Sequence, residues 1–216
     1  MSGNEDLRVA ILSVVARLEE KGFNHGSSGN VSCRHGDGVL ITPTGGNSGN
    51  TAPDEIVRIT YDGTVIGEGM PSSEWHMHTQ ILRAFPHVQA VVHTHADACV
   101  ALSCLRKPIP AFHYMVAGFG GDDIRCARYA TFGTADLAAS AVEALDGRTA
   151  CLLANHGMIA MGKTLEGAFN ATIKLETLAR QYILALQAGE PVLLPPEEMA
   201  RVRGKYGSYG AGRVPG

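Results

Sequence analysis

Apolar residues recur at every third or fourth position in several stretches of the chain. Residues 5–21 show this spacing clearly, and the stretch ends at Lys21-Gly22. A helix with one buried face has this pattern, and Asn4 is a suitable N-cap for it. Further helices are predicted over residues 72–85, 96–106, 134–145 and 165–188, the last closed by Gly189.

Short apolar runs between turn residues predict strands. The runs cover residues 30–42, 57–69, 87–96 and 149–162. The first contains Gly36-Asp37-Gly38 and the second Asp62-Gly63, so each predicts a hairpin. The last predicts two strands joined by a turn at Asn155-His156-Gly157. Because helices and hairpins interleave without strict βαβ alternation, we expect an α/β protein with a mixed, largely antiparallel sheet covered by helices on both sides.

The length of 216 residues fits a single domain, which we assign to residues 1–216. Residues 203–216 are rich in glycine and basic, which predicts a mobile C-terminal tail. The 18 Lys and Arg against 21 Asp and Glu include no basic run, which argues against a nucleic-acid partner. No apolar stretch approaches the roughly 18 residues that cross a membrane.

Cysteine usage and the first residues indicate the compartment. The chain has five cysteines, an odd number, and none of them forms a CxxC pair. This favours reduced thiols in the cytoplasm. The polar, acidic start MSGNEDLRV does not resemble a secretory signal.

The most informative chemical pattern is His93-Thr94-His95 after an apolar lead-in. On a strand, residues i and i+2 point to the same face, so two imidazoles there can bind a divalent metal ion. The alternative is a pair of unrelated core or surface histidines. His76 and His78 have the same spacing, but on the predicted helix their side chains diverge by about 200°. We therefore expect no shared metal site for them.

His156 and Glu74 can complete such a site. His156 follows an apolar strand and precedes a glycine, which places its ring on a tight turn. Beside the other two histidines it gives a three-histidine site with one position open for substrate. Glu74 stands at the start of a predicted helix. It serves there either as a capping residue or as a carboxylate held near the metal, as ligand or as general base.

Three loops of small polar residues remain, at residues 26–30, 42–46 and 71–73. Backbone N–H groups and hydroxyls in such loops can bind phosphate or carboxylate, although each loop taken singly is most often only a turn. Neither a P-loop nor a GxGxxG motif is present. The sequence therefore predicts neither an NTPase nor a dinucleotide enzyme.

Five ordered blocks, from about Leu7 to about Tyr209, resemble the class II aldolase/adducin family. They are GSSGNVSCRHGDGVLITPTGG, MPSSEWHMH, AVVHTHA, IPAFHYMVAGFGGDDIRCARYATFGT and ANHGMIAMGKTLEGA. The HYM and YATFGT segments look closest to L-fuculose-1-phosphate aldolase-like members. The resemblance implies a three-layer α/β/α subunit with a largely antiparallel central sheet. It also implies a C4 homotetramer with active sites between neighbouring subunits.

The resemblance also implies the roles of particular residues. One Zn²⁺ per subunit is expected on His93, His95 and His156, with Glu74 on or near the metal and acting on protons. Tyr114 would reach the neighbouring subunit's site as a proton donor. The expected phosphate contacts are Gly29, Asn30, Thr44, Gly45, Ser72 and Ser73, with Ser27 as a possible addition. Phe132 would position the aldehyde, and Tyr209 or Tyr206 would close over the site.

The activity that the resemblance implies is reversible cleavage of a ketose 1-phosphate to dihydroxyacetone phosphate and an aldehyde. The ketose would be L-fuculose 1-phosphate or a related or 5-modified ribulose 1-phosphate. Two alternatives remain open at this point. One is a sugar-phosphate 4-epimerase, decarboxylase or dehydratase built on the same metal site. The other is a non-enzymatic adducin-type binding module, which would lack a complete metal site.

Overall fold

One mixed sheet forms the centre of the molecule. The computed structural model describes residues 2–208, and within them eight strands pair in the order β4-β3-β2-β1-β5-β8-β7-β6. The strands are β1 Asn30–His35, β2 Gly38–Ile41, β3 Val57–Thr60, β4 Val65–Ile66, β5 Ala90–Thr94, β6 Cys126–Ala127, β7 Ala150–Leu153 and β8 Gly157–Gly162. The β6–β7 pair is parallel and the other neighbours are antiparallel. The predicted fold class is confirmed.

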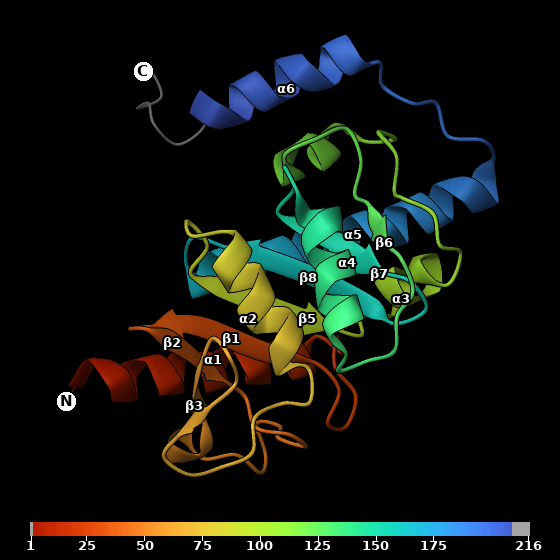
Figure 1. Ribbon diagram of the computed structural model, residues 1–216. Coiled ribbons are helices and arrows are strands. Elements are labelled where there is room, and N and C mark those ends of the chain that lie inside the picture. Colours follow the sequence, from red (N-terminus) through yellow and green to blue (C-terminus); the bar gives the residue numbers. More distant parts are fainter. Residues whose placement is uncertain (1, 209–216) are drawn as a thin grey trace, which may run out of the picture.

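Helices cover both faces of this sheet. The α-helices are α1 Ser2–Glu20, α2 Trp75–Ala84, α3 Asp97–Ser103, α4 Ala135–Leu145, α5 Leu165–Ala188 and α6 Pro196–Ser208, and the 3₁₀ helices are η1 Pro53–Glu55 and η2 Tyr114–Phe119. In Figure 1, α2 and α4 cross in front of the sheet, and α1 and α5 lie behind it. The helix α3 packs beside α5 on that second face. The chain therefore has the three layers that the family resemblance implies.

The central strands are buried on both faces, which explains why their sequences are continuously apolar. In β5, Val91 faces α2 and α4, whereas Val92 packs with α1 on the opposite side. In β8, Ile159 and Met158 divide in the same way between the two faces. Each strand thus contributes to two cores, and the ends of these strands are held firmly where the site lies.

Several predicted helix and strand boundaries were wrong by a few residues. α2 begins at Trp75, not at Ser72, because the chain first makes a turn in which the Trp75 N–H bonds to the Ser72 carbonyl at 3.0 Å. α1 begins at Ser2, so Asn4 lies inside the helix and is not its N-cap. Capping residue types mark where a helix can start, but hydrogen bonding can extend past them. β5 ends at Thr94, so His95 follows the strand directly.

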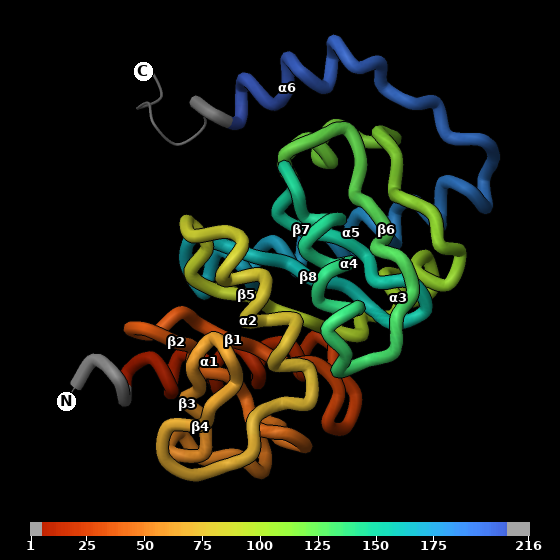
Figure 2. The backbone as a smooth tube through the Cα atoms, viewed as in Figure 1, coloured from red at the N-terminus to blue at the C-terminus, as the bar shows by residue number. Residues whose placement is uncertain are grey.

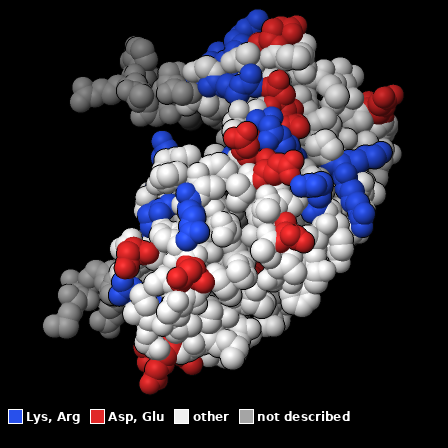
Figure 3. Space-filling model, viewed as in Figure 1, with Lys and Arg blue, Asp and Glu red and all other residues white. Residues whose placement is uncertain are grey.

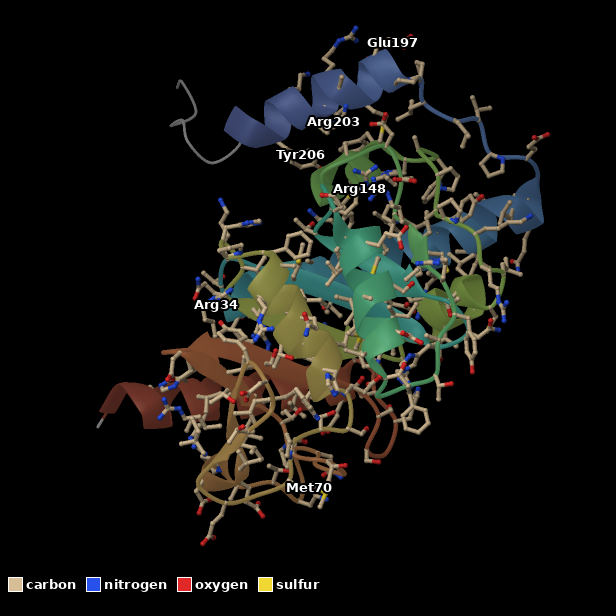
Figure 4. The ribbon with its side chains drawn as sticks, viewed as in Figure 1. Arg34, Met70, Arg148, Glu197, Arg203 and Tyr206 are labelled. Carbon is tan, nitrogen blue, oxygen red and sulfur yellow. The ribbon has the colours of Figure 1, made fainter. Side chains whose placement is uncertain are left out.

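The C-terminal end of α2 is held by Arg34, at the far end of β1. The Arg34 Nε–H donates to the Val88 carbonyl at 3.1 Å, and its guanidinium also bonds to the Leu82 carbonyl and the Tyr61 hydroxyl. A cation at the C-terminus of a helix complements the helix dipole. Arg34 therefore fixes the helix that carries Glu74 at its other end (Figure 4).

The tail that was predicted to be mobile covers residues 203–216, and its first part is helical. Residues 203–208 belong to α6, which packs on η2. Met199 is fully buried, Arg203 pairs with Asp122, and the Tyr206 ring lies against Gly118. Glycines in this helix lower its intrinsic propensity, and the tertiary contacts outweigh that effect. Residues 209–216, including Tyr209, lie outside the described residues.

Figure 2 shows the segment between α5 and α6 running around the outside of the molecule and bringing α6 to the side opposite α1. Figure 4 shows Arg203 and Tyr206 on the side of α6 that faces η2. On the face drawn in Figure 3, acidic and basic side chains lie next to one another over this region.

Among the helices described here, none combines the length and the apolar character needed to cross a bilayer.

Candidate active site

Three histidines meet where β5 ends. His93 is the fourth residue of β5, His95 follows the strand, and His156 lies in the turn between β7 and β8. Antiparallel pairing of Thr94 with Met158 places that turn beside His95. One ring nitrogen from each histidine lies within 4.8 Å of the others. The predicted convergence of the three rings is confirmed, and the sheet register is its cause.

The ring of His93 has a fixed orientation. It is fully buried, and its Nδ1 lies 2.9 Å from the carbonyl oxygen of Met158. A carbonyl only accepts, so Nδ1 carries the proton and donates it. Nε2 is therefore the ring nitrogen that faces the cluster, and it lies 3.0 Å from His95 Nε2. A backbone partner of this kind prepares a histidine as a metal ligand.

Glu74 closes the fourth side of the cluster. Its Oε2 is 3.1 Å from His93 Nε2, and its Oε1 is 3.4 Å from His156 Nε2. Oε1 is buried and has no hydrogen-bond partner. Three imidazole nitrogens and a buried carboxylate oxygen without a donor fit one divalent cation. The donor set suits Zn²⁺, and it suits Co²⁺ or Mn²⁺ by the same criteria.

The charges of these groups fit the same interpretation. Burial, together with the neighbouring His93 and His156, lowers the pKa of His95 to about 4, and burial lowers the pKa of His156 to about 4 as well. Burial alone would raise the pKa of Glu74. The charge of His93 and hydrogen bonds from His93 and Asn30 outweigh it, so this pKa lies well below its usual range. At neutral pH the cluster therefore offers neutral imidazoles at His95 and His156 and a carboxylate at Glu74, whereas Glu74 raises the pKa of His93 against the effect of burial.

Two glycines let the backbone come close enough to form the site. Gly29 has φ +76°, and a Cβ there would lie 2.2 Å from the side-chain oxygen of Asn24. At Gly157 a Cβ would lie 2.5 Å from the Thr94 carbonyl and 3.1 Å from the His95 ring. A side chain at Gly157 would push apart the strand ends that carry the histidines, and one at Gly29, next to Asn30, would be strained by the positive φ and would displace the Asn24 side chain.

A cavity of about 360 Å³ opens above the cluster and brings the three small-residue loops together. The second and third loops are joined directly, because the Thr44 N–H donates to the Met70 carbonyl and the Ser72 N–H to the Thr42 carbonyl, both at 3.0 Å. All the residues predicted to contact phosphate line this cavity: Gly29, Asn30, Thr44, Gly45, Ser72 and Ser73, with Ser27 beside them.

The residues predicted for the aldehyde side are placed differently from one another. Phe132 lines the cavity and is 66% exposed. Tyr114, in η2, is half exposed and does not line it. It borders a separate hollow together with Tyr206 of α6. Within the single chain, therefore, neither of these two tyrosines lies in the cavity beside the histidines.

Sequence reasoning did not identify Tyr129 and Asn155, which also line the cavity. Asn155 has φ +52°, a conformation that asparagine tolerates better than most residues. Its Oδ1 accepts a hydrogen bond from the Arg106 Nε–H at 2.6 Å, and the Arg106 guanidinium lies over the Tyr129 ring. The turn before His156 was predicted, but its sequence does not show where the Asn155 side chain points.

His76 and His78 lie on different sides of α2, as their spacing on a helix predicts. The His76 ring stacks on Trp75, with ring centroids 3.7 Å apart. His78 is fully buried on the opposite side of α2, between Ser32 and Asn30. Helical geometry separates the two side chains, as the spacing predicts.

Comparison with known proteins gives consistent matches over most of the chain. The model of the Class II Aldolase and Adducin N-terminal domain family matches residues 9–183. A 5-methylthioribulose-1-phosphate/5-deoxyribulose-1-phosphate aldolase from Rhodospirillum rubrum is 50% identical over 204 residues, which are 94% of this chain and 92% of that protein. An L-fuculose phosphate aldolase from Escherichia coli K12 is 42% identical over 201 residues, covering 93% and 94%.

A solved structure of an L-fuculose 1-phosphate aldolase superposes with a TM-score of 0.90 at 39% identity, covering 94% of this chain and 96% of that one. The family match, the relatives and the fold agree with one another along nearly the full length. The three-histidine cluster is what a metal-dependent member of such a family requires. The chain therefore belongs to the class II aldolase/adducin family.

Proposed function

We propose that this class II aldolase reversibly cleaves a 5-modified ribulose 1-phosphate, such as 5-methylthioribulose or 5-deoxyribulose 1-phosphate, to dihydroxyacetone phosphate and an aldehyde. The observation that carries the proposal is the position of the metal-competent cluster at the base of a cavity lined by three small polar loops. A Lewis acid and a phosphate site in the same cavity suit a short phosphorylated ketose.

Phosphate would bind in the loops around Gly29, Gly45 and Ser72. Their backbone N–H groups and hydroxyls are neutral donors, and no lysine or arginine is among the described residues that line the cavity. Such donors bind an anion without forming a strong ion pair. A product phosphate held in this way can still be released.

The chemistry would be divided between the cation and two side chains. When bound, a divalent cation supplies Lewis-acid stabilisation of the negative charge that develops on the substrate oxygens. Glu74 would deliver a proton to C3 after the C3–C4 bond breaks, and would remove it in the synthetic direction. Tyr114 would exchange the proton of the C4 hydroxyl. We propose Zn²⁺ as the cation, one per subunit.

Tyr114 can act in this way only on a neighbouring subunit, since it lies outside the cavity of its own. We therefore propose the homotetramer that the resemblance implies, with each active site shared between two subunits. We also propose a cytoplasmic location, because all five cysteines are free. Tyr209 as the residue that closes the site stays a prediction.

The proposed substrate class rests on the wall of the cavity beside the histidines. Ala130, Phe132 and the ring of Tyr129 are apolar surfaces there. A 5-methylthio or 5-deoxy group suits such a wall, whereas L-fuculose 1-phosphate carries an additional hydroxyl that would need a polar partner. Because the same residues belong to the segment that resembles L-fuculose-1-phosphate aldolases, fuculose 1-phosphate is the substrate to compare with. The 50% identical relative carries the corresponding name.

The test is release of dihydroxyacetone phosphate by zinc-loaded protein from a panel of ketose 1-phosphates. The panel contains fuculose, ribulose, 5-deoxyribulose and 5-methylthioribulose 1-phosphates, and a ketose 5-phosphate serves as control. We expect the highest kcat/KM for a 5-modified pentose. A higher value for fuculose 1-phosphate would overturn the substrate class. No release from the whole panel would overturn the aldolase assignment in favour of an epimerase, decarboxylase or dehydratase.

A further inference from the structure

A buried chain of hydrogen bonds runs from the middle of α2 to Glu74. His78 Nε2 lies 2.5 Å from Asn30 Oδ1, and Asn30 Nδ2 lies 3.0 Å from Glu74 Oε2. The other ring nitrogen of His78, Nδ1, is 2.7 Å from the hydroxyl of Ser32. His78 is fully buried and does not line the cavity. It can reach the site only through Asn30.

The direction of each hydrogen bond in this chain follows from its end at Glu74. An ionised carboxylate only accepts, so Asn30 must turn its amide N–H toward Glu74 and its oxygen toward His78. That oxygen also only accepts, so Nε2 of His78 carries the ring proton. Burial lowers the pKa of His78 to about 3, so the ring is neutral and Nδ1 accepts from the Ser32 hydroxyl.

The opposite orientation of Asn30 would place its carbonyl oxygen against the carboxylate of Glu74. Nothing in the Asn30 side chain itself prevents this, because its two ends are nearly equal in size. Glu74 favours the observed orientation from one end of the amide, and the Nε2–H of His78 holds the other end in it. Pairing of Asn30 with His93 across β1 and β5 already fixes the backbone position, so rotation of the amide is the freedom that remains.

We propose that His78 is a positioning residue for the aldolase reaction: its Nε2–H fixes the amide of Asn30, which in turn holds the Glu74 carboxylate where it exchanges the C3 proton. The second N–H of the Asn30 amide does not bond to Glu74. Asn30 lines the cavity on the side of the proposed phosphate loops, so this N–H can serve there. The inference rests on the proposed function and names a residue that the metal cluster does not include.

The first test is made on the unmodified protein. Nitrogen-15 NMR of labelled histidine distinguishes the two neutral ring tautomers. We expect His78 to carry its proton on Nε2 and to stay neutral near pH 6. A proton on Nδ1 instead would overturn the proposal, regardless of which substrate the enzyme cleaves.

The second test compares three variants. His78→Leu removes the donor, whereas His78→Gln places an amide N–H close to the position of the ring Nε2. His76→Leu, on the same helix, is the matched control, because its ring stacks on Trp75 away from the chain. The readouts are zinc content, KM, and the rate of C3 proton exchange in dihydroxyacetone phosphate.

We expect His78→Leu to retain zinc and lose about 10- to 100-fold in the exchange rate, the range for groups that orient site residues. His78→Gln should recover most of that loss, and His76→Leu should stay within about twofold of the unmodified enzyme. Exchange at the unmodified rate in His78→Leu would overturn the proposal. If His78→Leu does not fold, His78→Phe takes its place as the variant without the donor. Exchange at the unmodified rate per folded molecule in that variant would overturn the proposal, and a loss that His78→Gln recovers would support it.

Failure of the proposed function gives a different result. In that case the unmodified protein shows no exchange with dihydroxyacetone phosphate, while the tautomer of His78 still decides the hydrogen-bond chain. The two failures are therefore distinguishable.

Discussion

Glu74 combines two properties at the residue scale that rarely occur together. It is 6% exposed, yet its pKa stays low because, against the effect of burial, His93 and Asn30 stabilise its charge. One carboxylate oxygen accepts from Asn30, and the other faces His156 with no donor. A carboxylate that stays charged and unpaired on one side can both face a cation and take up a proton.

We predict that Glu74→Gln retains zinc and loses proton exchange at C3 of dihydroxyacetone phosphate by about 10²- to 10⁴-fold, the usual contribution of a general base. The three histidines still bind the metal, but the amide has no basic oxygen. Proton exchange followed by NMR in deuterated buffer measures the loss. Glu143→Gln, on the exposed side of α4, is the control. Exchange at the unmodified rate would remove Glu74 from the role of base.

At the element scale, the close contact of β5 with the start of β8 sets the geometry of the site. The Thr94 carbonyl and the rings of His93 and His95 surround Gly157, where a Cβ would lie 2.5 to 3.3 Å from their atoms. The strand pairing and the ligand positions are therefore set by the same contact.

Gly157→Ala should lower both zinc affinity and stability. The added methyl group forces β5 and β8 apart, at a cost of about 1–3 kcal/mol in the free energy of unfolding. Zinc titration and chemical denaturation measure the two effects. Gly204→Ala is the control, because a Cβ there meets nothing within 4 Å and helix propensity favours alanine. Unchanged zinc affinity in Gly157→Ala would contradict the role given to this contact.

Local signals in the sequence account for the elements that were predicted correctly. The helix predicted over residues 134–145 forms as α4, with Thr134 as its N-cap, and Gly189 closes α5 as predicted, because caps act within one turn. η2, β6 and α6 were missed, since they form through contacts with distant segments such as the packing of α6 on η2.

The residues of the candidate site also fall into those with a local signal in the sequence and those placed by contacts with distant segments. The His93–His95 spacing and the turn at His156 are visible in the sequence. The family resemblance adds that all three histidines bind one metal ion. Asn155 and His78 form hydrogen bonds with Arg106 and Asn30, which lie 49 and 48 positions away in the chain. Spacing along the sequence carries no information about such partners.

At the scale of the whole molecule, the proposed active site is incomplete within one subunit. The cluster and the phosphate loops share one cavity, but Tyr114 lies at another hollow, beneath α6. Its half-exposed side chain is available to a second copy of the chain. An assembly that brings η2 of one subunit to the cavity of the next would complete the site.

Mixing two inactive variants tests this arrangement. Glu74→Gln and Tyr114→Phe should each be nearly inactive, and tetramers reassembled from an equal mixture should recover activity. Random mixing gives about one site in four with both residues intact if the tyrosine comes from a neighbour. Activity is measured after unfolding and refolding the mixture, with each variant refolded alone as control. No recovery in reassembled tetramers would mean that Tyr114 acts within its own subunit or not at all.

The most direct test of the central claim is metal-dependent release of dihydroxyacetone phosphate. The protein is stripped with a chelator, zinc is added back in measured steps, and product release is recorded beside His93→Ala and His156→Ala. We predict no release without metal, full release at one zinc per subunit, and loss of both zinc and activity in each variant. Release by the stripped protein, or by either alanine variant at the unmodified rate, would contradict the account.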